Sequence, residues 1–144
     1  MKVFGAAELL DGLELPFEVV PVPELRGGGF AIVRGLTALE RGRYEQALIR
    51  NDDAGKRIFD GAFGRSELLV RSLVANAESD PEKPARPGER LFSDADAARL
   101  EGLRADVADR LFGAAKKLSG LSPEDLDELK KACAGAQTGD SPSN

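Results

Sequence analysis

Three consecutive glycines, Gly27, Gly28 and Gly29, are the first residues whose type and spacing could do chemistry. Glycine-rich loops bind phosphate when they connect a strand to a helix, as in GxxxxGK[ST] or GxGxxG. Here the glycines lie between two runs rich in β-branched residues, and neither Lys-Ser nor Lys-Thr follows them. We therefore interpret them as the turn of a β-hairpin, where no helix N-terminus faces an anion.

Acidic residues are the next candidates, because Asp52-Asp53 and the pair Asp94 and Asp96 could hold a hard cation. A calcium loop needs ligands at alternate positions, a central glycine and a closing glutamate. The stretch DADAA, 94–98, breaks that pattern. We interpret these acids as first-turn residues stabilised by a helix dipole. No pair of acids stands out for glycoside chemistry.

A nucleophilic cysteine is the third possibility, and Cys133 is the single cysteine of the chain. The chain has no histidine, so no imidazole can activate this thiol or bind a metal. We interpret Cys133 as a small apolar residue, and one cysteine is typical of a reducing compartment. The sequence predicts no catalytic residue, no cofactor and no metal site.

Composition limits the class of protein. The 144 residues fit one domain, and 42% of them are hydrophobic. The net charge of -5 is unfavourable for nucleic acid, and the acids that open the segment SPEDLDE argue against a DNA recognition helix. The first residues lack the unbroken apolar region of a signal peptide, and no stretch approaches the length of a transmembrane helix. We therefore expect a cytoplasmic protein without nucleic-acid or membrane partners.

The first half of the chain predicts a short helix and a hairpin. GAAELLDG, 5–12, predicts one or two helical turns that end at Gly12. Residues 17–22 and 30–34 predict paired strands. Pro21 lacks a ladder donor and places the first strand at a sheet edge.

A capping box predicts the next helix, since Thr37 is followed three residues later by Glu40. This helix should extend to about Asn51, and residues 56–64 are compatible with another short helix. SELLVRSLVAN, 66–76, fits both helix and strand, and its β-branched content favours a strand. Four residues of the helix that begins at Thr37 are expected to face inward: Leu39, Tyr44, Ala47 and Leu48.

The second half predicts a flexible loop and two amphipathic helices. Residues 76–90 hold three prolines and many charges, so they should form the loop. A capping box at 93–96 opens the first helix, and Ser122 with Asp125 opens the second after a left-handed cap at Gly120. One apolar stripe is expected on the first helix: Leu100, Leu103, Val107, Leu111, Ala114 and Leu118.

The predicted fold is α+β, with a small antiparallel sheet of about three strands followed by amphipathic helices. Residues 1–133 should form one domain and 134–144 a disordered tail. Part of the helical apolar surface is available for a partner's helix, although the same stripes also suit a plain core. The residues we expect to contact such a partner are Leu111, Phe112, Leu118, Leu121, Leu126 and Leu129.

The order of several segments resembles the tail assembly chaperones of long-tailed bacteriophages and prophages. The resemblance covers about residues 14–133 and rests on PFEVVPVPEL, VRGLTALERGRYE, SELLVRSLV, Leu91-Phe92 before Ser-Asp-Ala-Asp, and RLFGAAKKLSGLSPEDLDELKKA. No single segment is specific to this family, but the order and spacing of the segments are. One departure is the proline-rich loop 76–90, which stands where the family has a short Asp/Gly turn. It leaves open how SELLVRSLV pairs with Leu91-Phe92.

This resemblance implies a non-enzymatic role in virion morphogenesis. The family binds the helix-rich tape measure protein, keeps it soluble and helps recruit tail tube subunits, and it is absent from the mature virion. A generic protein-binding regulatory adaptor of a bacterial host is the alternative, and a small enzyme subunit is a third class. The resemblance assigns no residue of this chain to catalysis.

Overall fold

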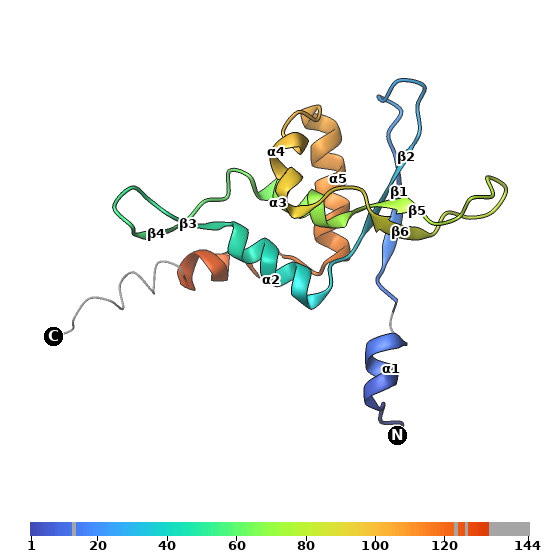
Figure 1. Ribbon diagram of the computed structural model, residues 1–144, viewed down its shortest axis with the longest axis horizontal. Helices are drawn as coiled ribbons and strands as arrows, with labels where there is room; N and C mark the ends of the chain where they lie inside the picture. Colours follow the sequence, from blue (N-terminus) through green and yellow to red (C-terminus); the bar gives the residue numbers. More distant parts are fainter. Residues whose placement is uncertain (13, 123, 126, 133–144) are drawn as a thin grey trace.

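The computed structural model describes residues 1–12, 14–122, 124–125 and 127–132. Its main element is a four-stranded antiparallel sheet of order β1-β2-β5-β6, beside which β3 and β4 form a separate two-stranded ribbon (Figure 1). The predicted α+β class is confirmed, with one more strand in the main sheet than expected. Leu126, Cys133 and the predicted tail 134–144 lie outside the described residues.

The N-terminal hairpin forms as predicted. β1 (Phe17–Pro21) pairs antiparallel with β2 (Phe30–Arg34), and β1 lies at the sheet edge. All three glycines of the turn have positive φ, +83°, +71° and +148°. Glycine adopts such angles without steric cost, which explains the run of three and confirms the turn.

The helix α2 (Ala38–Ala47) begins with the predicted capping box. The Glu40 amide donates to Thr37 Oγ1 at 3.1 Å, and the Thr37 amide donates to Glu40 Oε1 at 3.0 Å. The helix ends before Asn51, because β3 (Ile49–Asn51) turns back to pair with β4 (Arg57–Phe59). The expected end of this helix and the suggested short helix over 56–64 are therefore wrong.

The turn between β3 and β4 is built on Asp52, whose Oδ1 accepts hydrogen bonds from the amides of Ala54 at 2.9 Å and Lys56 at 2.8 Å.

The sequence predicts that Leu39 faces inward, but in the structure Leu39 is 63% exposed. Tyr44 marks the buried face of α2. Leu39 precedes it by five residues, and because each residue turns the helix by about 100°, Leu39 lies roughly 140° away from Tyr44 around the helix axis.

The run 66–76 divides into a helix and a strand. α3 (Gly64–Ser72) leads directly into β5 (Leu73–Asn76), so the prediction of a strand is correct only for its last residues. Every residue from Leu68 to Val74 is buried. A segment that is buried on all sides has no polar face, so the spacing of its apolar residues cannot distinguish a helix from a strand.

β5 continues into a hairpin with β6 (Pro87–Arg90), and the Leu91 amide donates to the Leu73 carbonyl at 3.1 Å. This answers the pairing question raised by the loop. The loop has ordered ends, since Asn76 Oδ1 accepts the amides of Glu78 at 2.9 Å and Arg86 at 3.0 Å. The last residues of the predicted loop 76–90 are thus a strand.

The C-terminal helices differ from the single long helix predicted after Ser93. The capping box at 93–96 is present but opens a short 3₁₀ turn, η1 (Asp94–Asp96), followed by α4 (Ala97–Leu100). The chain then turns through 101–104 before α5 (Ala105–Leu118). The helical spacing of charged and apolar residues continues across this turn, so periodicity alone does not reveal the break.

The predicted end of α5 is confirmed. Gly120 has φ +68°, and the Leu121 amide reaches back to the Lys116 carbonyl at 3.0 Å. The following cap is also confirmed, because the Ser122 amide donates to Asp125 Oδ2 at 2.8 Å. Residues 124–125 and 127–132 are helical.

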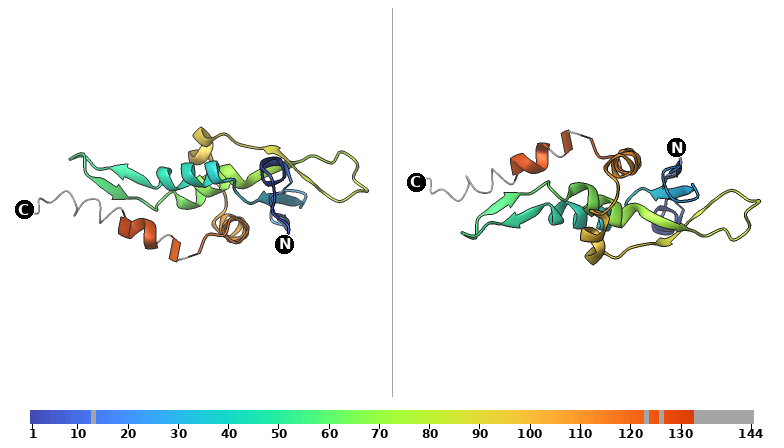
Figure 2. Two further views of the ribbon diagram at one scale, coloured as in Figure 1. Left: turned by 90° about the horizontal axis from the view of Figure 1, so that it is seen from below. Right: turned by 90° about the horizontal axis from the view of Figure 1, so that it is seen from above.

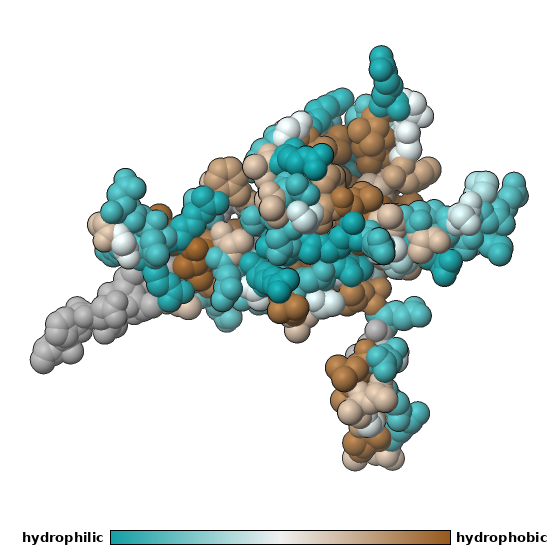
Figure 3. Space-filling view, in the orientation of Figure 1, coloured by the Kyte–Doolittle hydropathy of each residue, from teal (hydrophilic) through white to brown (hydrophobic). Residues whose placement is uncertain are grey.

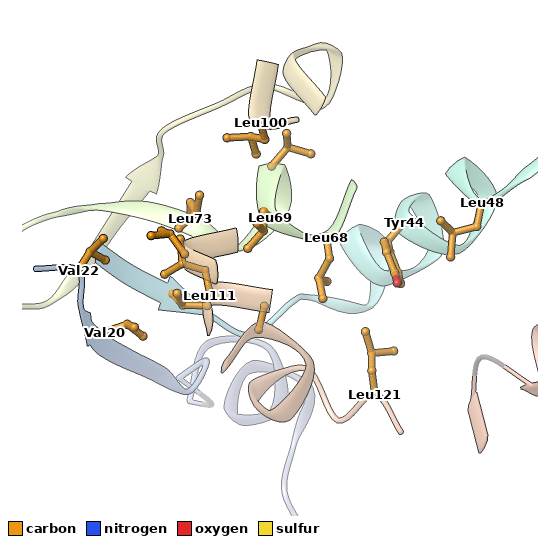
Figure 4. Packing of buried hydrophobic residues seen from close by; sticks show 14 residues of the cluster. Val20, Val22, Tyr44, Leu48, Leu68, Leu69, Leu73, Leu100, Leu111 and Leu121 are labelled. Atoms are coloured by element: carbon orange, nitrogen blue, oxygen red, sulfur yellow. The ribbon is translucent and has the colours of Figure 1, made fainter. Parts of the chain in front are cut away.

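The core lies between one face of the sheet and the helices α3, α4 and α5 (Figure 4). Val33, Leu68, Val70 and Ala115 are 0% exposed at its centre. Viewed from below and above, α5 is seen nearly end-on and lies to one side of the sheet (Figure 2). Within the described residues, no helix is long and apolar enough to cross a membrane.

The helix α1 (Ala6–Asp11) is the exception to this packing. It ends at Gly12 as predicted, but it has no buried residue. Figures 1 and 3 show it projecting from the body, with hydrophobic side chains on its surface.

Candidate functional site

The segment VRGLTALE, which carries part of the family resemblance, forms one compact structural unit. Arg34 Nη2 contacts Glu40 Oε2 at 2.7 Å, and Glu40 also completes the cap of α2. Between them, a Cβ on Gly35 would lie 2.6 Å from the Leu118 carbonyl oxygen. Gly35 therefore lets the end of α5 pack against the connection between β2 and α2.

A second ionic cluster fixes α3 to the sheet. Arg71 is 4% exposed and contacts Glu67 Oε2 at 3.3 Å and Asp94 Oδ2 at 3.2 Å. Arg90 contacts the same Asp94 at 2.7 Å and donates to the Val70 carbonyl. Burial acts to raise the pKa of Asp94, but the Arg90 hydrogen bond and the Arg71 charge outweigh it and lower that pKa. These charges are paired within the fold, and we assign them a structural role.

A groove of about 520 Å³ lies between α2, the β3–β4 ribbon, α3, α5 and the last helical residues. It is open to the surface on one side. Aromatic and aliphatic side chains from several elements meet in it: Tyr44 from α2, Leu48 just after α2, Phe59 from β4 and Phe112 from α5. The remaining lining residues are Gly61, Ala62, Gly64, Arg65, Asp109, Asp127 and Lys130.

Charged side chains surround this apolar floor. Arg65 forms an ion pair with Asp109, which joins α3 to α5 at one rim. Lys130 Nζ lies 5.5 Å from the centre of the Phe59 ring, and Lys116 Nζ lies 4.8 Å from that of Phe112. The groove thus combines an apolar floor with a charged rim.

Tyr44 supplies the polar atom of the floor. Its side chain is 1% exposed, and burial raises its pKa to about 12. The phenol therefore stays protonated at neutral pH and can donate a hydrogen bond.

The six residues predicted to contact a partner are placed differently from one another. Phe112 lines the groove, while Leu118 and Leu129 are half-buried and pack against the core. Leu111 and Leu121 are only 4% and 9% exposed and belong to the core cluster. Leu126 lies outside the described residues.

Sequence reasoning missed the other side of the groove. Phe59 lies in a segment for which the sequence suggests a short helix, although the structure has a strand there. For Tyr44 the sequence predicts only a buried position. Strand pairing between β3 and β4 brings Phe59 opposite Ile49, next to the end of α2. The turn residues Asp52 and Gly55, with φ +80° at Gly55, were the signal that could have revealed this hairpin.

Among the described residues, no group of three or more acids or cysteines is placed to hold a metal ion. The most perturbed carboxyl belongs to Glu24, whose hydrogen bond with Arg110 lowers its pKa to about 2. This pair joins the hairpin to α5 on the surface and lies away from the residues that line the groove.

Comparisons with protein-family models, with curated proteins and with solved structures found no match to this chain. Function must therefore be inferred from the groove and from the order of the sequence motifs.

Proposed function

We propose that this protein is a non-enzymatic tail assembly chaperone that binds the tape measure protein, keeps it soluble and helps recruit tail tube subunits. The observation that carries the proposal is the groove, whose floor combines Phe59, Phe112 and Leu48 with the Tyr44 hydroxyl. The resemblance of the motifs supplies the identity of the partner. The protein acts in the host cytoplasm and is absent from the finished virion.

The groove suits one face of an amphipathic helix. Such a helix presents apolar side chains at positions i, i+3, i+4 and i+7, which need a hydrophobic groove with a polar rim. The rim offers both signs of charge, Asp109 and Asp127 beside Arg65 and Lys130. Free tape measure helices expose repeated apolar surface, which is an aggregation hazard until a partner covers it.

The experiment is co-expression of the full chain with a tape measure protein of the same genome, followed by a solubility assay and pull-down. The wild-type chain should hold the tape measure protein in solution and co-purify with it. Phe112→Glu should reduce recovery about tenfold or more, because a buried charge without a partner opposes binding. Leu39→Glu is the matched control, since Leu39 is 63% exposed on α2 and does not line the groove.

Two results would contradict the proposal. In the first, the tape measure protein stays insoluble and unbound with the wild-type chain. In the second, Phe112→Glu keeps its fold by circular dichroism and binds as well as Leu39→Glu does. If the chain instead captures a host protein through the same groove, the regulatory adaptor replaces the chaperone.

A further inference from the structure

The strand β1 lies at the edge of the four-stranded sheet, and no described strand pairs with its outer side. The Gly35 amide donates to the Pro16 carbonyl and the Val22 amide to the Gly29 carbonyl, both at 2.8 Å. In an antiparallel ladder these hydrogen-bonded pairs recur at every second residue. The backbone groups of Phe17 and Val19 therefore face away from β2, toward the open edge.

The open edge is short. Pro21, next in the alternation, has no amide proton, and its carbonyl accepts a hydrogen bond from Arg110 at 3.2 Å. Edge strands with free groups pair readily with a strand from another chain. Only Phe17 and Val19 offer both a donor and an acceptor in this strand.

Exposed apolar side chains gather at both ends of β1. The N-terminal segment holds Val3 and Leu10, which are 80% and 81% exposed, together with Phe4 and Leu9. At the other end, the hairpin tip holds Phe30, which is 71% exposed. Figure 1 shows α1 and this tip at opposite ends of β1.

Both ends carry charges of both signs. In the N-terminal segment Glu8 pairs with Lys2, and in the hairpin connection Glu24 pairs with Arg110, which leaves Asp11 at one end and the exposed Arg26 at the other. Within the described residues, neither Asp11 nor Arg26 forms an ion pair. Each end therefore lacks an apolar cover and a counter-ion that the other end could supply.

We propose that two copies of this chain associate through their β1 strands, which pair antiparallel around a two-fold axis near Val19. This pairing joins the two four-stranded sheets into one. It also places α1 of each copy beside the hairpin tip of the other. Leu9 and Leu10 then meet Phe30 of the second copy, and Asp11 approaches its Arg26.

A second copy fits this surface better than a different occupant. The surface is self-complementary, which is the property that a two-fold interface requires. With Val19 opposite Val19, each Glu18 faces Val20, so like charges are not paired across the edge. The same chain cannot satisfy its own ends easily, because Pro16 keeps Leu15 extended and directs α1 away from the tip.

The first test is sedimentation equilibrium of the full chain combined with cysteine cross-linking. In a Cys133→Ser background, Val19→Cys should give a disulfide-linked dimer on mild oxidation, because paired strands bring opposite Cα atoms within disulfide range. Ile58→Cys is the matched control, since Ile58 is 37% exposed and Val19 39%, and it lies on the separate ribbon. A monomer at all concentrations up to about 0.5 mM would overturn the proposal, as would equal cross-linking of both variants.

A second test separates the edge from the ends. Val19→Pro removes an amide that faces away from β2, so the monomer should fold while dimer dissociation increases about tenfold or more. Arg26→Glu should weaken the dimer several-fold, and adding Asp11→Arg should restore it. If folded Arg26→Glu dimerises like the wild type and Asp11→Arg has no effect in that background, the proposed arrangement is wrong.

Discussion

Helices α5 and α1 both carry an amphipathic pattern, yet the fold uses them in opposite ways. α5 buries Val107, Ala108, Leu111 and Ala115 against the sheet and α3. α1 buries nothing, and its Leu10 is 81% exposed. An apolar stripe therefore shows that a helix needs a partner surface, but it does not show whether that surface belongs to the same chain.

Length explains part of this difference. α5 has 14 residues and ends in a glycine cap that turns Leu121 back into the core. α1 has 6 residues, and an isolated helix of that length is marginal in water. In the proposed dimer, contacts with the hairpin tip of the second copy would stabilise it.

The largest expected effect comes from deleting matched leucine side chains in the two helices. Leu111→Ala should lower the free energy of unfolding by about 2–5 kcal/mol, because it leaves a cavity in the core. Leu10→Ala should change it by less than about 0.5 kcal/mol, as surface substitutions usually do. Urea unfolding at low protein concentration, where the chain is monomeric, measures both. Equal losses would mean that α1 packs on its own body.

Adding a methyl group tests how closely the end of α5 is held. Gly35→Ala should cost about 1–3 kcal/mol, because the new Cβ would lie 2.6 Å from the Leu118 carbonyl oxygen. Gly113→Ala is the control within α5, since no atom lies within 4 Å of its added Cβ. It should stabilise the helix by up to about 1 kcal/mol. A neutral Gly35→Ala in thermal unfolding would contradict this close contact.

The smallest effect concerns pH and the surface pair between Glu24 and Arg110. The hydrogen bond from Arg110 lowers the pKa of Glu24 from 4.5 to about 2 in the folded chain. A lowered carboxyl pKa stabilises the fold above pH 4.5, and this contribution is lost as the pH falls toward 2. Glu24→Gln should therefore flatten the acid limb of the stability curve slightly. The difference should shrink in high salt, because the pair is solvent-exposed.

Local sequence rules predicted the hairpin, three caps and the end of α5. Each of these depends on residues close in sequence, such as Thr37 with Glu40 or Gly120 with Leu121. The division of 66–76 into α3 and β5 was not predictable in this way. Val70 and Leu73 are both buried, one in a helix and one in a strand, and only the surrounding elements decide between them.

The groove was half predictable. Phe112 follows from the amphipathic pattern of α5, whereas Leu111 beside it lies in the core. The two differ by about 100° around the helix axis, and the sequence does not state which side the sheet covers. Phe59 enters the groove through the pairing of β3 with β4, a contact that depends on the fold of that whole segment.

The loop 77–86 makes hydrogen bonds within itself and is joined to the sheet at its two ends. Asn76 Oδ1 closes its base by accepting the Arg86 amide, and Asp80 Oδ1 accepts the amide of Glu82 near its tip. All residues from 81 to 84 are exposed. Chain length can therefore vary here without moving β5 or β6, and a fluorescent reporter or affinity tag inserted between Pro81 and Pro84 would leave both the groove and the β1 edge accessible.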